Sequence, residues 1–162
     1  MAAALREGWR GPLFLQGDHF QMNAKKYAAD PAAEVDAVKT LTVEGIHAGF
    51  FNIDVDSSTL VDLSQPGHEA QQQKNGDVCA ELTAFIRAHE PEGVTISVGG
   101  EIGEVGGKNS TPEEFEAFMA VFRASLEGRR AGAMGISKIS IQTGTSHGGV
   151  PLPDGSIAQV SV

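Results

Sequence analysis

Histidines and carboxylates recur in this sequence directly after short apolar runs. Imidazole nitrogens and carboxylate oxygens together bind divalent metal ions, and a set with two nitrogens and few oxygens favours zinc over manganese or iron. Taken singly, an acidic residue after a strand is as often a helix cap as a ligand. Their recurrence after every predicted strand favours a shared metal site. The residues concerned are Asp18, His19, Asp54, Asp56, Glu101, Glu104 and His147.

Four apolar runs predict the strands that would position these side chains. The runs are 13–17, 48–53, 94–98 and 136–141. Longer amphipathic segments separate them, and alternating strands and helices of this kind form parallel βαβ units. Because the carboxyl ends of parallel strands meet at one rim, the histidines and carboxylates should converge there. The inner face of the strands, which the predicted helices do not cover, is expected to be apolar. Its candidate residues are Leu13, Leu15, Phe51, Ile96, Val98, Ile139 and Ile141.

Three helices are predicted between the strands. The first begins at Asp30-Pro31 and ends near Gly45, and the second covers 66–89 with a break or a delayed start around Asn75-Gly76. The third begins at Thr111, because the sequence Thr-Pro-Glu-Glu contains an N-cap, a first-turn proline and a capping box.

Two glycine-rich loops follow the third and fourth runs, at 99–107 and 144–149. Glycine lets the backbone approach a ligand closely, and free N–H groups in the second loop could hold phosphate oxygens. Either loop alone is a weak signal, since each could be only a turn.

The composition excludes several classes of function. With 162 residues, 41% of them hydrophobic, the chain is long enough for one domain with a real core. A formal net charge of −9 argues against nucleic acid or an anionic membrane as partner, because both need clustered Lys and Arg. No run approaches the roughly 18–20 apolar residues of a membrane helix and no signal-peptide core is seen, so we expect a cytoplasmic protein. The single cysteine, Cys79, is interpreted as a small core residue.

Four short motifs, in order and at matching spacing from about residue 12 to 149, resemble the class II (zinc-dependent) fructose-bisphosphate and tagatose-bisphosphate aldolases. The segment Gln16-Gly17-Asp18-His19 resembles the family's strand that ends in Asp-His. Asn52-Ile53-Asp54 lies where the family has an Ile-Asp strand end. The loop 100–107 resembles the family's Glu-Leu-Gly-x-x-Gly-Gly loop, and 143–148 its Gly-Thr-x-His-Gly turn.

The resemblance implies a site and a reaction. His19 and His147 would be ligands of a Zn²⁺ ion, and Asp18 would be the acid–base residue beside it. Glu101 and Asp54 would lie near an alternative metal position, Glu101 being the favoured contact. The reaction implied is cleavage or formation of a carbon–carbon bond in a ketose phosphate, through a zinc-stabilised enediolate of a dihydroxyacetone phosphate-like substrate. Gly148 and Gly149 would border the phosphate site, and Asn23 is also expected to contact the substrate.

The sequence departs from the family in three places. The family's third zinc histidine, in a His-Gly-Gly-Ser-Gly-like motif on a later strand, has no counterpart here. Phe20-Gln21-Met22-Asn23 and Val55-Asp56-Ser57-Ser58 replace the family's usual continuations. These differences indicate a divergent branch, for which a different sugar substrate is an open alternative.

Four strands are also too few for a closed eight-stranded barrel of about 250 residues. We therefore expect residues 1–162 to be a single partial domain, the middle of a TIM (β/α)8 barrel that is homo-oligomeric in full-length form.

Two other functions remain open at this level. One is a non-catalytic barrel subunit of a tagatose-bisphosphate aldolase, although the presence of both Asp18-His19 and His147 argues against it. The other is a metal-dependent sugar epimerase on the same scaffold, because epimerisation can use the same metal-stabilised chemistry.

Overall fold

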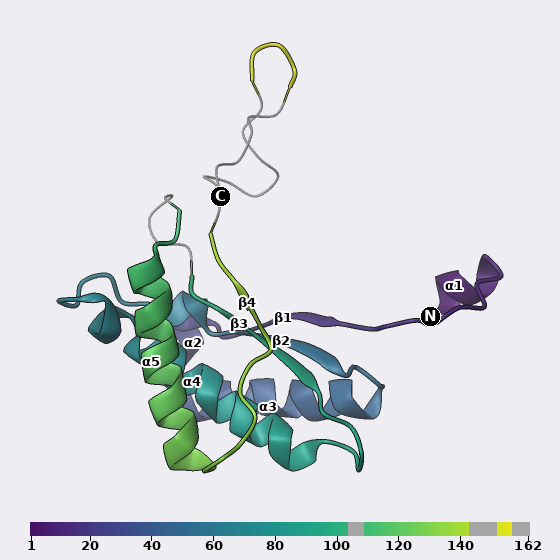
Figure 1. Ribbon diagram of the computed structural model, residues 1–162, viewed down its shortest axis with the longest axis horizontal. Helices are drawn as coiled ribbons and strands as arrows, with labels where there is room; N and C mark the ends of the chain where they lie inside the picture. Colours follow the sequence, from purple (N-terminus) through teal and green to yellow (C-terminus); the bar gives the residue numbers. More distant parts are fainter. Residues whose placement is uncertain (104–108, 143–151, 157–162) are drawn as a thin grey trace.

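A computed structural model describes residues 1–103, 109–142 and 152–156 of the chain. Its centre is a four-stranded, all-parallel sheet in the order β1-β2-β3-β4, so strands adjacent in sequence are neighbours in the sheet (Figure 1). The strands are β1 Gly17–Gln21, β2 Asn52–Asp56, β3 Ser97–Glu101 and β4 Lys138–Ser140. The predicted α/β class with a parallel sheet is therefore confirmed.

Three long helices connect consecutive strands: α3 Pro31–His47, α4 His68–His89 and α5 Pro112–Arg129. The Asp30 side chain accepts a hydrogen bond from Ala33 N and caps α3. Thr111 and Glu114 form the predicted capping box at the start of α5. Three short elements were not predicted: α1 Ala2–Arg6, α2 Ala24–Ala29 and the 3-10 turn η1 Ser58–Leu60. Of these, α1 buries no residue and stands apart from the sheet (Figure 1).

Each strand begins two to four residues later than predicted, by the bounds above. Leu13 and Phe14 precede β1 and are exposed, Phe14 to 88%, so the prediction of a buried strand over 13–17 is wrong. Ile96 is fully buried but precedes β3. The apolar runs thus mark the approach to each strand, whereas β1, β2 and β3 themselves carry glycines or acidic residues.

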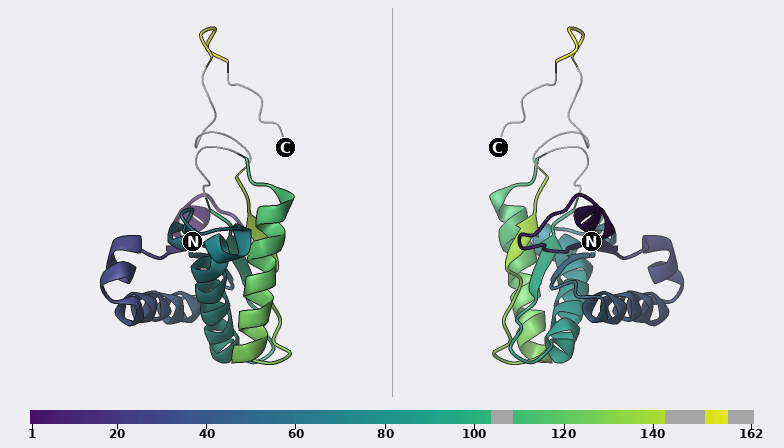
Figure 2. Two further views of the ribbon diagram at one scale, coloured as in Figure 1. Left: turned by 90° about the vertical axis from the view of Figure 1, so that its left-hand side faces the viewer. Right: turned by 90° about the vertical axis from the view of Figure 1, so that its right-hand side faces the viewer.

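The two faces of the sheet differ in character. The helices α3, α4 and α5 lie on one side of it (Figure 2), where Ile53, Val55 and Val98 are at most 1% exposed and pack against core residues of these helices. Residues that alternate with them in β2 and β3 point the other way. These are Asn52, Asp54, Asp56, Ser97, Gly99 and Glu101.

The expectation of an apolar inner face is therefore wrong. Val98 faces the helices, and the face of the sheet that the described helices leave open is polar. Alternation in the strands explains this: the side chains buried by the helices are the apolar ones, and their neighbours are polar.

The helix α4 is continuous through Asn75-Gly76, contrary to the predicted break. Gly76 permits close packing on α5, since a Cβ at this position would lie 2.6 Å from Val121 Cγ1. Glycine here serves helix contact rather than helix termination. Cys79 is fully buried in the core, as predicted, and burial raises the pKa of its thiol to about 12. In the part of the chain that the structure describes, no helix combines the length and apolarity needed to cross a membrane.

Candidate metal centre

A β-bulge in β1 presents both Asp18 and His19 on the open face. Gly17 pairs with Ile53 and Phe20 pairs with Val55, so two residues of β1 lie opposite the single residue Asp54 of β2. His19 takes up the extra length with a left-handed φ of 51°. As a result Gly17 and Phe20 are buried while the two residues between them are exposed. Bulges next to active sites commonly redirect a side chain in this way.

The His19 ring is held by Asp56, the last residue of β2. His19 Nδ1 lies 3.1 Å from Asp56 Oδ2, with the histidine side chain 53% exposed and the aspartate 1% exposed. The hydrogen bond from the His19 ring to Asp56 is the main reason why the pKa of His19 is raised, although burial of the ring opposes it; Asp18 and Glu101 raise it further.

The Asp56 carboxylate is kept ionised by several donors. Burial would raise its pKa, but hydrogen bonds from Ser58, Gln21 and His19 together outweigh burial and lower it. Ser58 donates from both its N–H and its hydroxyl to Oδ1, and Gln21 donates from its amide to Oδ2. A carboxylate on one ring nitrogen of a histidine fixes the orientation of the other, which is the usual support of a metal-binding imidazole.

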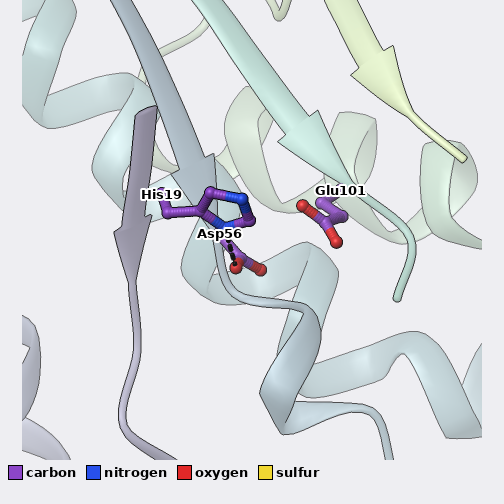
Figure 3. Close-up of side chains that lie close together, drawn as sticks. All are labelled: His19, Asp56 and Glu101. Atoms are coloured by element: carbon purple, nitrogen blue, oxygen red, sulfur yellow. Dashed lines mark hydrogen bonds and ion pairs between the residues drawn. The ribbon is translucent and has the colours of Figure 1, made fainter. Parts of the chain in front are cut away.

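Glu101, at the end of β3, completes a cluster of metal-ligand size. One potential ligand atom from each of His19, Asp56 and Glu101 lies within 4.8 Å of the other two. Figure 3 shows the three side chains close together, with His19 on β1 and with Asp56 and Glu101 at the ends of β2 and β3. Imidazole with carboxylates suits Zn²⁺, Mn²⁺ or Fe²⁺. The donor set therefore fits a divalent cation.

Asp54 lies one step farther from this rim, beside Lys138 of β4. Both are half-buried, and Gly99 makes room for them: a Cβ there would come within 1.9 Å of Asp54 Oδ1 and 2.7 Å of Lys138 Cε. Burial raises the pKa of Asp54, which the charge of Lys138 partly offsets. Lys138 Nζ also donates to Asn52 Oδ1. On the open face, Asp54 and Lys138 therefore lie side by side one step before the rim, and the possible metal ligands lie at the rim itself.

The sequence predicted that Asp54 lies near a metal position. Among the described residues, however, Asp56 is the aspartate of β2 that joins the cluster. The two residues are two apart in one strand and so share a face, which alternation alone cannot separate. The signal that could have separated them is the strand end, because Asp56 is the last residue of β2.

The other predicted site residues fall into two groups. Asn23 is the N-cap of α2, where its side-chain oxygen accepts from Lys25 N and Lys26 N. The predicted zinc ligand His147 and the predicted phosphate-site residues Gly148 and Gly149 lie outside the described residues, as does Glu104.

Comparison of the chain with protein-family models, with curated proteins and with solved structures gave no match.

Proposed function

We propose that this chain contributes the metal centre of a class II aldolase, which cleaves or forms a carbon–carbon bond in a ketose phosphate. The observation that carries the proposal is the convergence of His19, Asp56 and Glu101 at the carboxyl end of a parallel sheet, with Asp18 beside them on a bulge. Active sites of α/β proteins lie at this end of the strands. The motif resemblance supplies the reaction class.

In this proposal His19 and Glu101 hold the cation together with His147, and Asp56 orients the His19 ring. Zn²⁺ is the preferred ion. When bound, it would polarise the substrate ketone and stabilise the enediolate that forms when the carbon–carbon bond breaks.

Asp18 handles the proton. In cleavage its carboxylate takes the proton of the substrate hydroxyl, and as the carbon–carbon bond breaks that oxygen becomes the aldehyde carbonyl. In condensation the protonated Asp18 returns the proton to the aldehyde oxygen while the new bond forms. Its exposure on the open face of β1 and its position next to His19 support this role.

We further propose that the four strands are part of the wall of a (β/α)8 barrel whose lumen is the polar face, and that the complete enzyme is a cytoplasmic homo-oligomer acting on a sugar phosphate. Consecutive parallel strands with helices on one side support the barrel.

The test is an assay of the product of the complete gene for triose phosphate release from fructose and tagatose bisphosphates. Chelation should abolish turnover and added Zn²⁺ should restore it. Asp18→Ala should lower kcat by about 10²–10⁴-fold while metal content stays near that of the wild type. His47→Ala, an exposed histidine at the end of α3, is the matched control.

Three outcomes would contradict the proposal. Unchanged turnover in Asp18→Ala would remove the role given to that residue. An epimerised sugar without triose phosphate would identify an epimerase. Bound metal without any turnover would favour the non-catalytic subunit.

A further inference from the structure

Three polar side chains lie buried beneath the candidate metal centre, between α4 and the ends of β2 and β3. They are Ser57, Gln72 and Asn75, exposed to 0%, 2% and 0%. Buried polar groups lower stability unless they are hydrogen-bonded, and apolar residues of similar size would usually fill such a place at less cost. Their presence in the core therefore calls for a reason beyond packing.

Asn75 connects the backbone at the end of β3, which carries Glu101, to the residue that follows Asp56 at the end of β2. Its amide nitrogen donates to the carbonyl oxygen of Glu101 at 2.8 Å. Its amide oxygen accepts from the hydroxyl of Ser57, the residue after Asp56, at 2.7 Å. The Asn75 side chain thus connects the carbonyl group of Glu101 to Ser57, the residue next to Asp56.

Gln72 extends the same connection along β3. It lies one helical turn before Asn75, accepts from the Asn75 amide at 2.8 Å and donates to the carbonyl oxygen of Ile102 at 2.9 Å. The two amides therefore hold two successive carbonyl groups at the end of β3.

These hydrogen bonds occur where the sheet no longer connects the two strands. The pairing of β2 with β3 runs from Asn52–Ser97 to Asp54–Gly99 and stops two residues before Asp56 and Glu101. Beyond that point the separation of the strand ends depends on what lies between them and α4. The view of Figure 3 shows Asp56 and Glu101 on these two separate strand ends, with the His19 ring bonded to Asp56.

We propose that Asn75, supported by Gln72, is a positioning residue that sets the distance between Glu101 and the Asp56–His19 pair, and so the affinity of the centre for a divalent cation. This inference rests on the metal centre of the proposed function. A small change in the separation of the strand ends would move one ligand out of reach of an ion held by the other.

The test measures binding of Zn²⁺ alone by calorimetry, the absorption spectrum of bound Co²⁺, and stability to denaturant. Asn75→Leu removes all of the side-chain hydrogen bonds at similar volume and should weaken the affinity about 10–100-fold, with an altered Co²⁺ spectrum. Gln72→Met removes the hydrogen bond to Ile102 O and the one that Gln72 accepts from Asn75, but it keeps the bonds of Asn75 to Glu101 and Ser57. It should give a smaller loss, and it provides a second variant if Asn75→Leu does not fold.

The matched control is Thr83→Val. Thr83 is also fully buried in α4, but its hydroxyl donates to Cys79 O within the helix. This variant should lose stability and keep its Zn²⁺ dissociation constant within about twofold of the wild type, because the hydrogen bond that it removes lies within α4. Ser57→Ala should weaken binding in the wild type and have a smaller further effect in Asn75→Leu, because that variant keeps only the bond from the Ser57 hydroxyl to the backbone carbonyl of residue 75.

Two negative results are distinguishable. If the wild type binds Zn²⁺ and both Asn75→Leu and Gln72→Met bind it equally well with the same Co²⁺ spectrum, the positioning role is wrong and the metal centre stands. If the wild type binds neither ion, the metal centre itself is wrong and the positioning role falls with it.

Discussion

His19 has a backbone conformation that residues with a side chain seldom adopt. Its φ of 51° lies in the left-handed region, which costs a non-glycine residue of the order of 1 kcal/mol. The surrounding sheet maintains this conformation because Gly17 and Phe20 on either side keep their partners in β2. The strain is thus located at the residue that the proposed function needs most.

Replacing His19 by glycine and by alanine separates the effect of losing the imidazole from the effect of the backbone strain. Both variants lose the imidazole and should lose cation binding. His19→Gly should be more stable than His19→Ala by about 1 kcal/mol, because only glycine adopts a positive φ without a steric cost. Denaturant unfolding of the two metal-free variants measures the difference. Equal stabilities would mean that residue 19 does not keep its left-handed conformation.

The raised pKa of His19 predicts opposite pH dependences for folding and for metal binding. In the metal-free protein, the folded state binds the His19 proton more tightly than the unfolded chain does. The resulting stabilisation is fully present below the unfolded pKa of about 6.5 and is lost as pH rises through the folded value. Cation binding needs the neutral ring, so affinity should fall as pH drops through the same range.

NMR titration of the metal-free protein measures this pKa directly. The hydrogen bond that the His19 ring donates to Asp56 is the largest cause of the shift, so Asp56→Asn should lower the His19 pKa relative to the wild type. An unchanged titration in the variant would rule out Asp56 as the partner of the ring in solution.

At the scale of elements, the sequence predicted which strands and helices exist better than where each strand begins. Charge, capping and periodicity identified α3 and α5 because those signals are local: Asp30 and Thr111 act within one helical turn. The strands were placed too early because the helices in the described part of the chain cover one face of the sheet and leave the other open. Half of each strand is therefore polar or glycine, and residues such as Gly99 and Glu101 resemble loop.

The site could be predicted in part for a related reason. The sequence predicted Asp18, His19 and Glu101 as candidate site residues because each follows an apolar run, and this order is visible along the chain. The pairing of His19 with Asp56 spans 37 positions and depends on a bulge, and neither can be read from local spacing. The same holds for Asn75, whose role is set by tertiary contacts with Glu101 and Ser57.

The contact between α4 and α5 gives a prediction about glycine within helices. In Gly76→Ala the new methyl group would lie 2.6 Å from Val121 Cγ1 and 3.1 Å from the backbone N of Phe122, so the helices must move apart. Overpacking of this kind costs about 1–3 kcal/mol and should outweigh the gain of up to about 1 kcal/mol in helix propensity. The free energy of unfolding should therefore fall.

Gly128→Ala in α5 is the matched control, because a Cβ there meets nothing within 4 Å. It should raise the free energy of unfolding by about 0.5–1 kcal/mol through propensity alone. A gain of stability in both variants would show that α4 and α5 pack less closely at Gly76 than described.

At the scale of the whole molecule, the open face of the sheet combines several carboxylates in a chain that is acidic overall. The chain has a net charge of −9, and Asp54, Asp56 and Glu101 share this face with Asp18 on the bulge. Lys138, beside Asp54, offsets part of this negative charge. Mutual repulsion of the carboxylates lowers the stability of the metal-free fold, and a bound divalent cation would relieve it.

Divalent cations should therefore raise the thermal midpoint. An ion that binds only the folded state stabilises it by about 2.7 kcal/mol at a free concentration 100 times its dissociation constant. Differential scanning fluorimetry with Zn²⁺ or Mn²⁺, and then with excess chelator, should show a reversible shift. Glu101→Gln should reduce the shift strongly, and NaCl at equal ionic strength is the control for screening. An equal shift with NaCl would mean that no specific site is present.

The bulge in β1 also bears on how such a protein could evolve. Loss of one codon for Asp18 or His19 would leave a single residue opposite Asp54, and Gly17 and Phe20 would keep their partners Ile53 and Val55. The sheet would survive an in-frame deletion of three nucleotides, whereas the residue proposed to carry the proton or the one proposed to bind the cation would be gone. The proposed catalysis and the scaffold are thus separable by one small genetic event, and insertion of one residue at the same place would restore the arrangement.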